Sequence, residues 1–95
     1  MRKYETIFVM KTSLEEDKRN ALIEKFKGII SNDGEITKVD EWGNKRLAYE
    51  IQKLRDGYYV FCEFKANPSL PQELERNFKI ADEVIRYIVV NREEK

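Results

Sequence analysis

Few side chains in this 95-residue sequence could carry out covalent or acid–base chemistry. The sequence has no histidine and one cysteine, Cys62, in the middle of a strand-like run. A histidine general base, a Cys–His pair and a conventional zinc site containing histidine are therefore excluded. Cys62 is expected to pack as a small hydrophobe rather than act as a thiol nucleophile. We expect neither a metal nor another cofactor.

Cations are the other side chains that could bind a ligand, because they can hold phosphate groups. The candidates fall where a fold would bring chain segments to its rim: Arg2, Lys3, Lys45, Arg46, Lys53, Arg55, Arg86 and Arg92. Arg86 stands out because it lies within an otherwise apolar strand, where a phosphate or carboxylate partner would explain it. Yet 18 Lys and Arg are balanced by 18 Asp and Glu, so a nucleic-acid role needs local patches or a basic partner.

The elements that must position these residues begin with a strand and a helix. Residues 3–10 alternate, with Tyr4, Thr6, Phe8 and Met10 on one face and Glu5, Ile7 and Val9 on the other. A capping box at residues 13–16 predicts the start of a helix, and Gly34 is the expected left-handed residue at its end. The apolar stripe of this helix is Leu14, Ala21, Leu22, Phe26, Ile29 and Ile30.

A β-hairpin is predicted next. Residues 35–51 form a strand with a bulge near Gly43, and residues 53–57 form a turn in which Asp56-Gly57 supplies a positive φ. The second arm covers residues 58–65. Its core-facing side chains are expected to be Tyr58, Val60, Cys62 and Phe64.

The last two elements are a short helix and a strand. A second capping box begins at Ser69, Pro71 is tolerated in the first turn, and Leu74, Phe78 and Ala81 form the apolar stripe. Residues 84–90 form the last strand, and residues 91–95 form a charged tail. In that strand we expect Ile85, Tyr87 and Val89 on one face and Arg86, Ile88 and Val90 on the other.

The order β-α-β-β-α-β predicts one α+β domain spanning residues 1–95. Two right-handed crossovers give a ferredoxin-like sandwich: a four-stranded antiparallel sheet, in the order 4-1-3-2, with two helices on one face. The apolar runs are too short to span a bilayer and the start lacks a signal peptide, so we expect no membrane partner and a cytoplasmic location.

The sheet face without helices is the expected partner surface. It would present an apolar patch of Ile7, Val9, Tyr59, Phe61, Ile88 and Val90. The alternative is that long neighbouring side chains, such as Arg86, Lys65 and Glu63, cover this patch.

Residues 43–51 form the string GNKRLAYEI, with the pattern GxKRLAYxI. This string resembles the signature of bacterial small-subunit ribosomal protein S six. The start MRKYETIFVM and the segment ADEVIRYIVVN are similar to the first and last strands of that family. The resemblance covers nearly the whole chain.

The resemblance implies a non-enzymatic scaffold that binds the central domain of small-subunit rRNA in the ribosome. It further implies a heterodimer with ribosomal protein S eighteen, whose basic charge would answer the net neutrality of this chain. It also places Arg86 near the rRNA backbone. No small-molecule substrate is implied.

Other functions of the same fold are possible from the residues alone. An acylphosphatase-like enzyme would need a glycine-rich anion cradle with an arginine after the first strand, and residues 11–13, Lys-Thr-Ser, hold neither. An RNA-recognition-like module would need a third-strand pattern that Arg55 and Tyr59 satisfy but Asp56, Gly57, Tyr58 and Cys62 do not. That module, or a small-molecule regulatory domain, remains the alternative.

Overall fold

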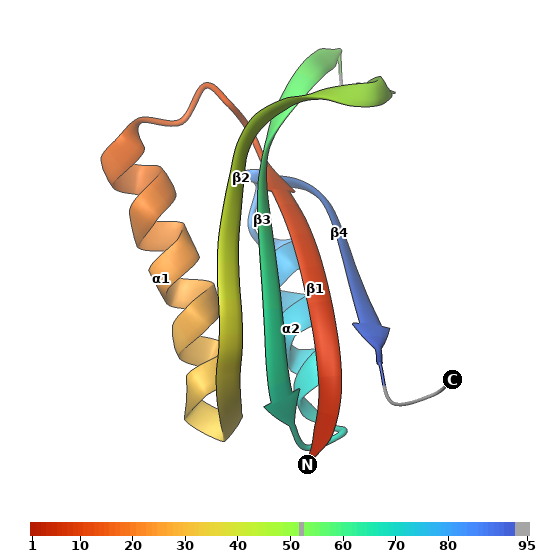
Figure 1. Ribbon diagram of the computed structural model, residues 1–95. Helices are drawn as coiled ribbons and strands as arrows, with labels where there is room; N and C mark the ends of the chain where they lie inside the picture. The colour runs from red at the N-terminus through yellow and green to blue at the C-terminus, as the bar shows by residue number, and fades with distance from the viewer. Residues whose placement is uncertain (52, 93–95) are drawn as a thin grey trace.

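The computed structural model describes residues 1–51 and 53–92, which form four strands and two helices (Figure 1). The elements are β1 (Arg2–Met10), α1 (Glu16–Asp33), β2 (Gly34–Ile51), β3 (Leu54–Ala66), α2 (Leu70–Ile80) and β4 (Val84–Asn91). All strand pairs are antiparallel, in the order β2-β3-β1-β4. The predicted ferredoxin-like topology is therefore confirmed, with β1 and β3 in the centre.

The core lies between one face of the sheet and the two helices. Its centre is a cluster of three phenylalanine rings, with Phe8 on β1, Phe26 on α1 and Phe78 on α2. Their centroids lie 4.7–5.1 Å apart, and all three side chains are buried. Because Phe8 contacts a ring from each helix, both helices must cover the same face of the sheet.

The core-facing residues of the central strands are as predicted. On β3, Val60, Cys62 and Phe64 are buried, and Tyr58 packs against the core from its edge. On β1, Tyr4, Thr6, Phe8 and Met10 are buried. The Thr6 hydroxyl donates a hydrogen bond of 2.7 Å to the carbonyl oxygen of Ile88, which satisfies the buried polar group.

Both predicted capping boxes are wrong. Helix α1 begins at Glu16, and its N-cap residue Glu15 makes no side-chain capping bond. The backbone N–H of Lys11 instead donates to the carbonyl of Glu83, which ties the preceding loop to the start of β4. At α2 the N-cap Ser69 has φ −79° and ψ −20°, helical values rather than the extended ones that capping requires. Pro71 does lie in the first turn, as predicted.

The end of α1 also differs from the prediction. Gly34 is extended, at φ −165°, and begins β2 directly. A side chain there would clash with the carbonyl of Lys65 and lie 2.9 Å from Cβ of Ala66. Gly34 therefore allows close approach of two strands rather than a left-handed turn.

The buried stripes of the helices are shifted from the predicted ones. On α1, Ile23 is buried with Phe26 and Ile30, whereas Ala21 is exposed. On α2, Leu70 is buried in addition to the predicted Leu74 and Phe78.

The hairpin turn lies nearer to the chain start than predicted. Ile51 pairs with Leu54, and Lys53 has the positive φ, 66°, that the prediction gave to Asp56-Gly57. Gly57 lies inside β3, opposite Lys45, and is buried.

Gly57 is required for packing rather than for a turn. The side chains of Val9, Leu47 and Ile85 converge over it, and an added Cβ would run into Cγ1 of Val9. The far part of the hairpin therefore bends across the sheet toward β4, as Figure 1 shows.

Two β-bulges change which face some residues occupy. The predicted bulge near Gly43 is present: Glu41 pairs with Val60 and Gly43 with Tyr59, which leaves Trp42 as the extra residue. Gly43 has φ 83°. A second bulge leaves Ile85 unpaired between Val84 and Arg86, so Ile85 joins Val9 and Leu47. Its predicted place beside Tyr87 and Val89, on the core face, is wrong, and Val84 packs against the core instead.

The chain end lies close to the predicted boundary. β4 includes Asn91, which was assigned to the tail, and the backbone N–H of Arg92 donates to the carbonyl of Lys3. The rest of the predicted tail lies outside the described residues. In the part of the chain that the structure describes, neither helix is long and apolar enough to cross a membrane.

Gly57→Ala should destabilise the fold by about 1–3 kcal/mol, because Val9 and Leu47 must move to admit the methyl group. The free energy of unfolding, from urea denaturation, measures this loss. Gly28→Ala is the matched control, since no atom within 4 Å meets its new Cβ on α1. This variant should gain about 0.5–1 kcal/mol. Equal effects of the two substitutions would contradict the packing role of Gly57.

Candidate nucleic-acid and partner interface

The sheet face opposite the helices carries most of the predicted partner surface. Ile7, Tyr59 and Phe61 are half-buried there, and Ile88 is 46% exposed. Val90 is also exposed. We call this side of the sheet the open face. A depression of about 240 Å³ opens on it, lined by Ile7, Val9, Tyr59, Arg86, Tyr87 and Ile88.

Val9 is the exception among the predicted partner residues. It is only 2% exposed, because Leu47 and Ile85 converge on it over Gly57. Val9 is therefore part of a small second cluster under the bent hairpin and cannot offer an extended contact surface. Its role as a partner residue stays a prediction, because Val9 does line the depression on the open face.

An aromatic stack that the sequence analysis did not identify lies on the open face. The Trp42 ring stacks on Phe61, with centroids 5.6 Å apart and planes inclined by 7°, and also faces Tyr59 at 6.4 Å. Its indole N–H donates to Oδ2 of Asp40 at 3.3 Å, and 41% of the residue stays exposed. The bulge predicted at Gly43 was the available signal, because one extra residue changes which side chains share a face.

Arg86 lies on the open face, as predicted, and it has a partner. Its Nη1 donates to the hydroxyl of Tyr49 at 3.1 Å, and its guanidinium carbon lies 5.6 Å from the centroid of that ring. Tyr49 is 62% exposed and comes from the far part of the hairpin. Tyr49 therefore orients the exposed guanidinium of Arg86 without neutralising its charge. The sequence analysis did not identify Tyr49 as a partner of Arg86.

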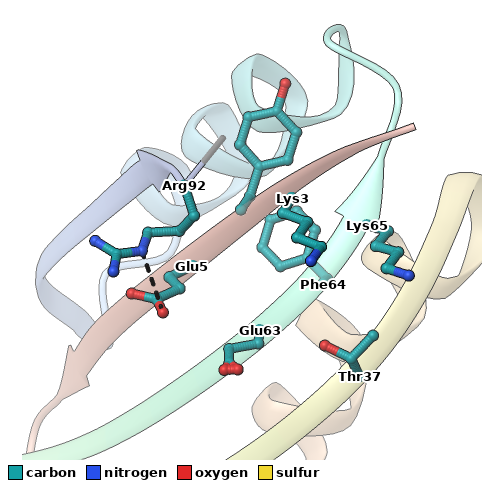
Figure 2. A pocket seen from close by; sticks show the side chains of 8 residues that line it. Lys3, Glu5, Thr37, Glu63, Phe64, Lys65 and Arg92 are labelled. Carbon is teal, nitrogen blue, oxygen red and sulfur yellow. Dashed lines mark ion pairs between the residues drawn. The ribbon is translucent and has the colours of Figure 1, made fainter. Parts of the chain in front are cut away.

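A charged depression of about 390 Å³ occupies the other end of the open face, near the N-terminus (Figure 2). Arg92 and Glu5 form an ion pair of 3.5 Å at its side. Tyr4 and Phe64, whose rings stack at 5.6 Å within the core, are also among the residues that line it. The polar lining consists of Lys3, Glu5, Thr37, Glu63, Lys65 and Arg92.

The predicted basic residues consequently form two groups rather than one rim. Lys3 and Arg92 border the charged depression, joined by Lys65, and Arg2 is exposed at the start of β1. The exposed cations of the hairpin lie toward the opposite end of the sheet (Figure 1): Lys45, Arg46, Lys53 and Arg55. Arg55 faces Glu50 at 3.8 Å, a pair that is well exposed and contributes little to stability.

The remaining candidate for chemistry, Cys62, is buried in the core. Burial is the largest cause that raises the pKa of its thiol, from the ordinary 9.0 to about 11. The thiol therefore stays protonated and unreactive near neutral pH. Among the described residues, no group of three or more acidic, cysteine or histidine side chains could hold a metal ion.

Tyr58 ties α1 to the edge of the sheet. Its hydroxyl donates to Oε1 of Glu41 at 2.6 Å, and the guanidinium of Arg19 lies 4.2 Å from its ring centroid. The hydrogen bond to Glu41 is the largest cause that raises the pKa of Tyr58. This contact stabilises the scaffold and offers no reactive group.

Comparison with known proteins gives one consistent result. A family model described as "Ribosomal protein S6" matches residues 3–91. The small ribosomal subunit protein bS6 of Alkaliphilus oremlandii is 55% identical over 93 residues, covering 98% of this chain and 99% of the relative. The bS6 protein of Clostridium perfringens is 56% identical over 95 residues, covering 99% of this chain and 100% of the relative.

A solved structure agrees with the sequence comparison. The crystal structure of 30S ribosomal protein S6 from Thermotoga maritima is similar with a TM-score of 0.92 and 34% identity. The similarity covers 98% of this chain and 89% of that one.

The buried Cys62 thiol should make stability fall as the pH rises. The unfolded thiol ionises near pH 9.0 but the folded one near 11, so the unfolded state loses its proton first and is favoured in that interval. We expect a loss of about 2 kcal/mol in the free energy of unfolding between about pH 9 and pH 11. Urea denaturation at a series of pH values measures it.

Cys62→Ala is the control for this pH dependence. It should be less stable at neutral pH, because it leaves a small cavity, but should lose less stability between the same pH values. Tyr58 adds a slope of the same sign in both proteins, so the difference between them isolates Cys62. Parallel pH profiles would contradict the assignment.

Proposed function

The chain belongs to the ribosomal protein S6 family, and we propose that it binds the central domain of small-subunit rRNA as a heterodimer with ribosomal protein S eighteen. It is a structural protein of the small ribosomal subunit and not an enzyme. Its location is that of the ribosome, in the cytoplasm. The proposal treats residues 1–95 as one domain that provides both binding surfaces.

The main observation in favour of the heterodimer is that neither helix covers the open face. Trp42, Ile88 and Val90 remain exposed there, beside the half-buried Ile7 and Phe61. A contiguous apolar area of this kind marks a contact surface, because leaving it in water is unfavourable. Of the long neighbours, Lys65 and Glu63 line the charged depression, and Arg86 lines the apolar one beside Ile7 and Ile88.

Charge supports a shared RNA-binding surface. The formal net charge of zero offers little release of counterions, so the chain alone should bind RNA weakly. The exposed cations of the hairpin, together with Arg86, form a local positive region on one side of the molecule. A basic partner on the open face would extend that region and supply the remaining neutralisation of phosphate.

A second mode of RNA binding is favoured by a specific observation. The stack of Trp42 on Phe61 and Tyr59 could accept unpaired bases without any partner protein. This mode predicts tight, selective RNA binding by the isolated chain. The heterodimer predicts that tight binding requires the partner.

Phe61→Glu should weaken binding of ribosomal protein S eighteen by about tenfold or more, because it places a charge in the centre of the apolar contact. The fold should persist, since Phe61 is only half-buried and lies on the face away from the core. Titration calorimetry measures the affinity, and circular dichroism verifies the fold. Ile80→Glu is the matched control, because Ile80 is exposed at the end of α2, in the helical layer. Unchanged affinity of a folded Phe61→Glu protein would exclude the open face.

Arg86→Ala should weaken rRNA binding by the preassembled heterodimer by about 1–3 kcal/mol and reduce the salt slope by about one phosphate contact. The physical reason is the planar guanidinium, which Tyr49 holds toward solvent and which can bind a phosphate through two hydrogen bonds. Filter binding at several salt concentrations measures both quantities.

Arg76→Ala is the control for Arg86→Ala, since Arg76 lies on α2, in the helical layer. Both variants should keep nearly the stability of the wild type. If Arg86→Ala lowered stability but left RNA affinity and the salt slope unchanged, Arg86 would be structural and its RNA contact excluded.

A further inference from the structure

Two carboxylates face each other across the central strands of the open face. Glu5 on β1 and Glu63 on β3 are directly paired positions, where like charges are unfavourable. Arg92 neutralises Glu5 at 3.5 Å. Glu63 is half-buried and has no hydrogen bond or ion pair within residues 1–51 and 53–92. Figure 2 shows the Glu5–Arg92 pair and, beside it, the side chain of Glu63. Lys38 on β2 is the directly paired position on the other side of Glu63, and Lys3 and Lys65 line the same depression, but within the described residues none of them forms an ion pair with this carboxylate.

The aromatic stack lies next to this carboxylate. Phe61 precedes Glu63 by two residues on the same strand face, a separation of about 7 Å between backbone positions. Trp42 stacks on Phe61 and keeps 41% of its surface exposed. Its ring already attracts one cation, because Nζ of Lys45 lies 6.0 Å from the centroid, at the outer limit for such a contact. Ring and carboxylate are thus within the span of one long cationic side chain.

We propose that Trp42 and Glu63 form a site for an arginine side chain of the partner protein, which stacks on the indole and pairs with the carboxylate. The inference rests on the proposed function, because the basic partner of the heterodimer carries this arginine. Arginine fits better than lysine, since its planar guanidinium can stack on a ring and donate two hydrogen bonds to a carboxylate at once.

Charge decides against RNA as the occupant. Asp40 accepts the indole hydrogen bond of Trp42, and Glu63 and Glu5 lie on the other side of Phe61. A base stacked on Trp42 would bring its phosphate toward these carboxylates, which repel it. Of the hairpin cations, Lys45 lies beside the Trp42 ring, whereas Arg46, Lys53 and Arg55 lie toward the far end of the sheet.

The only tryptophan of the sequence is Trp42, so intrinsic fluorescence reports on the proposed site alone. Purified ribosomal protein S eighteen that lacks tryptophan, by substitution if necessary, is the first probe. We expect its binding to change the Trp42 emission. Glu63→Gln and Trp42→Leu should each weaken the affinity by about tenfold or more, measured by calorimetry. Glu75→Gln, a half-buried carboxylate on α2, is the control and should change it less than twofold.

The results separate this inference from the proposed function. Binding of the partner with unchanged emission, and with no effect of Glu63→Gln or Trp42→Leu, overturns the arginine site and leaves the heterodimer intact. Absence of any partner binding overturns the heterodimer, and short peptides then test the site directly.

The peptides are penta-arginine and penta-lysine, at equal concentrations. A change of Trp42 emission with penta-arginine that exceeds the change with penta-lysine and is lost in Glu63→Gln supports the site. Equal responses to the two peptides overturn it. A single-stranded RNA oligonucleotide that changes the emission more strongly in Glu63→Gln than in the wild type also overturns it, and assigns the stack to bases.

Discussion

The contact among Phe8, Phe26 and Phe78 is the constraint on which the rest of the structure depends. It joins a central strand to both helices, and each ring pair contributes about 0.5–1.5 kcal/mol beyond the burial of its area. Because one residue of β1 must contact both helices, neither helix can move to the other side of the sheet. The same contact that stabilises the core therefore leaves a whole sheet face for binding.

The fold could be predicted because the strands bury every second residue, and this alternation is visible in the sequence. Strand residues alternate with a period of two, so the buried set on β1 and β3 follows from the sequence once a strand is identified. A bulge breaks that rule, since one extra residue reverses the faces of those that follow. The bulge at Gly43 carried a glycine signal, but the one at Ile85 arises from pairing with β1 and has no local signature. The assignment of Gly57 to a turn was wrong for a related reason. A glycine is needed there because Val9, which is distant in the sequence, packs directly over it.

The candidate surface was predictable only where it depends on local pattern. The position of Arg86 on the open face follows from alternation in β4. Its partner Tyr49 is 37 positions earlier in the chain, and the two meet only because the hairpin bends over the sheet. Trp42 and Glu63 likewise belong to different strands, so the sequence gives no spacing that would pair them. Both helix-capping predictions were wrong although the local patterns were favourable: Glu15 rather than Ser13 is the N-cap of α1, and the backbone of Ser69 is already helical.

The register shifts between β2 and β3 have a consequence for self-association. β2 is an edge strand of 18 residues, and a long regular edge offers unpaired N–H and C=O groups on which a second sheet can grow. Its register with β3 shifts after Ile36, after Glu41 and after Arg46, so no regular run of pairs exceeds four residues. An incoming strand would lose its hydrogen bonds at each shift. The edge thereby resists the strand-by-strand addition that begins amyloid growth, while the flat face beside it stays open to a folded protein.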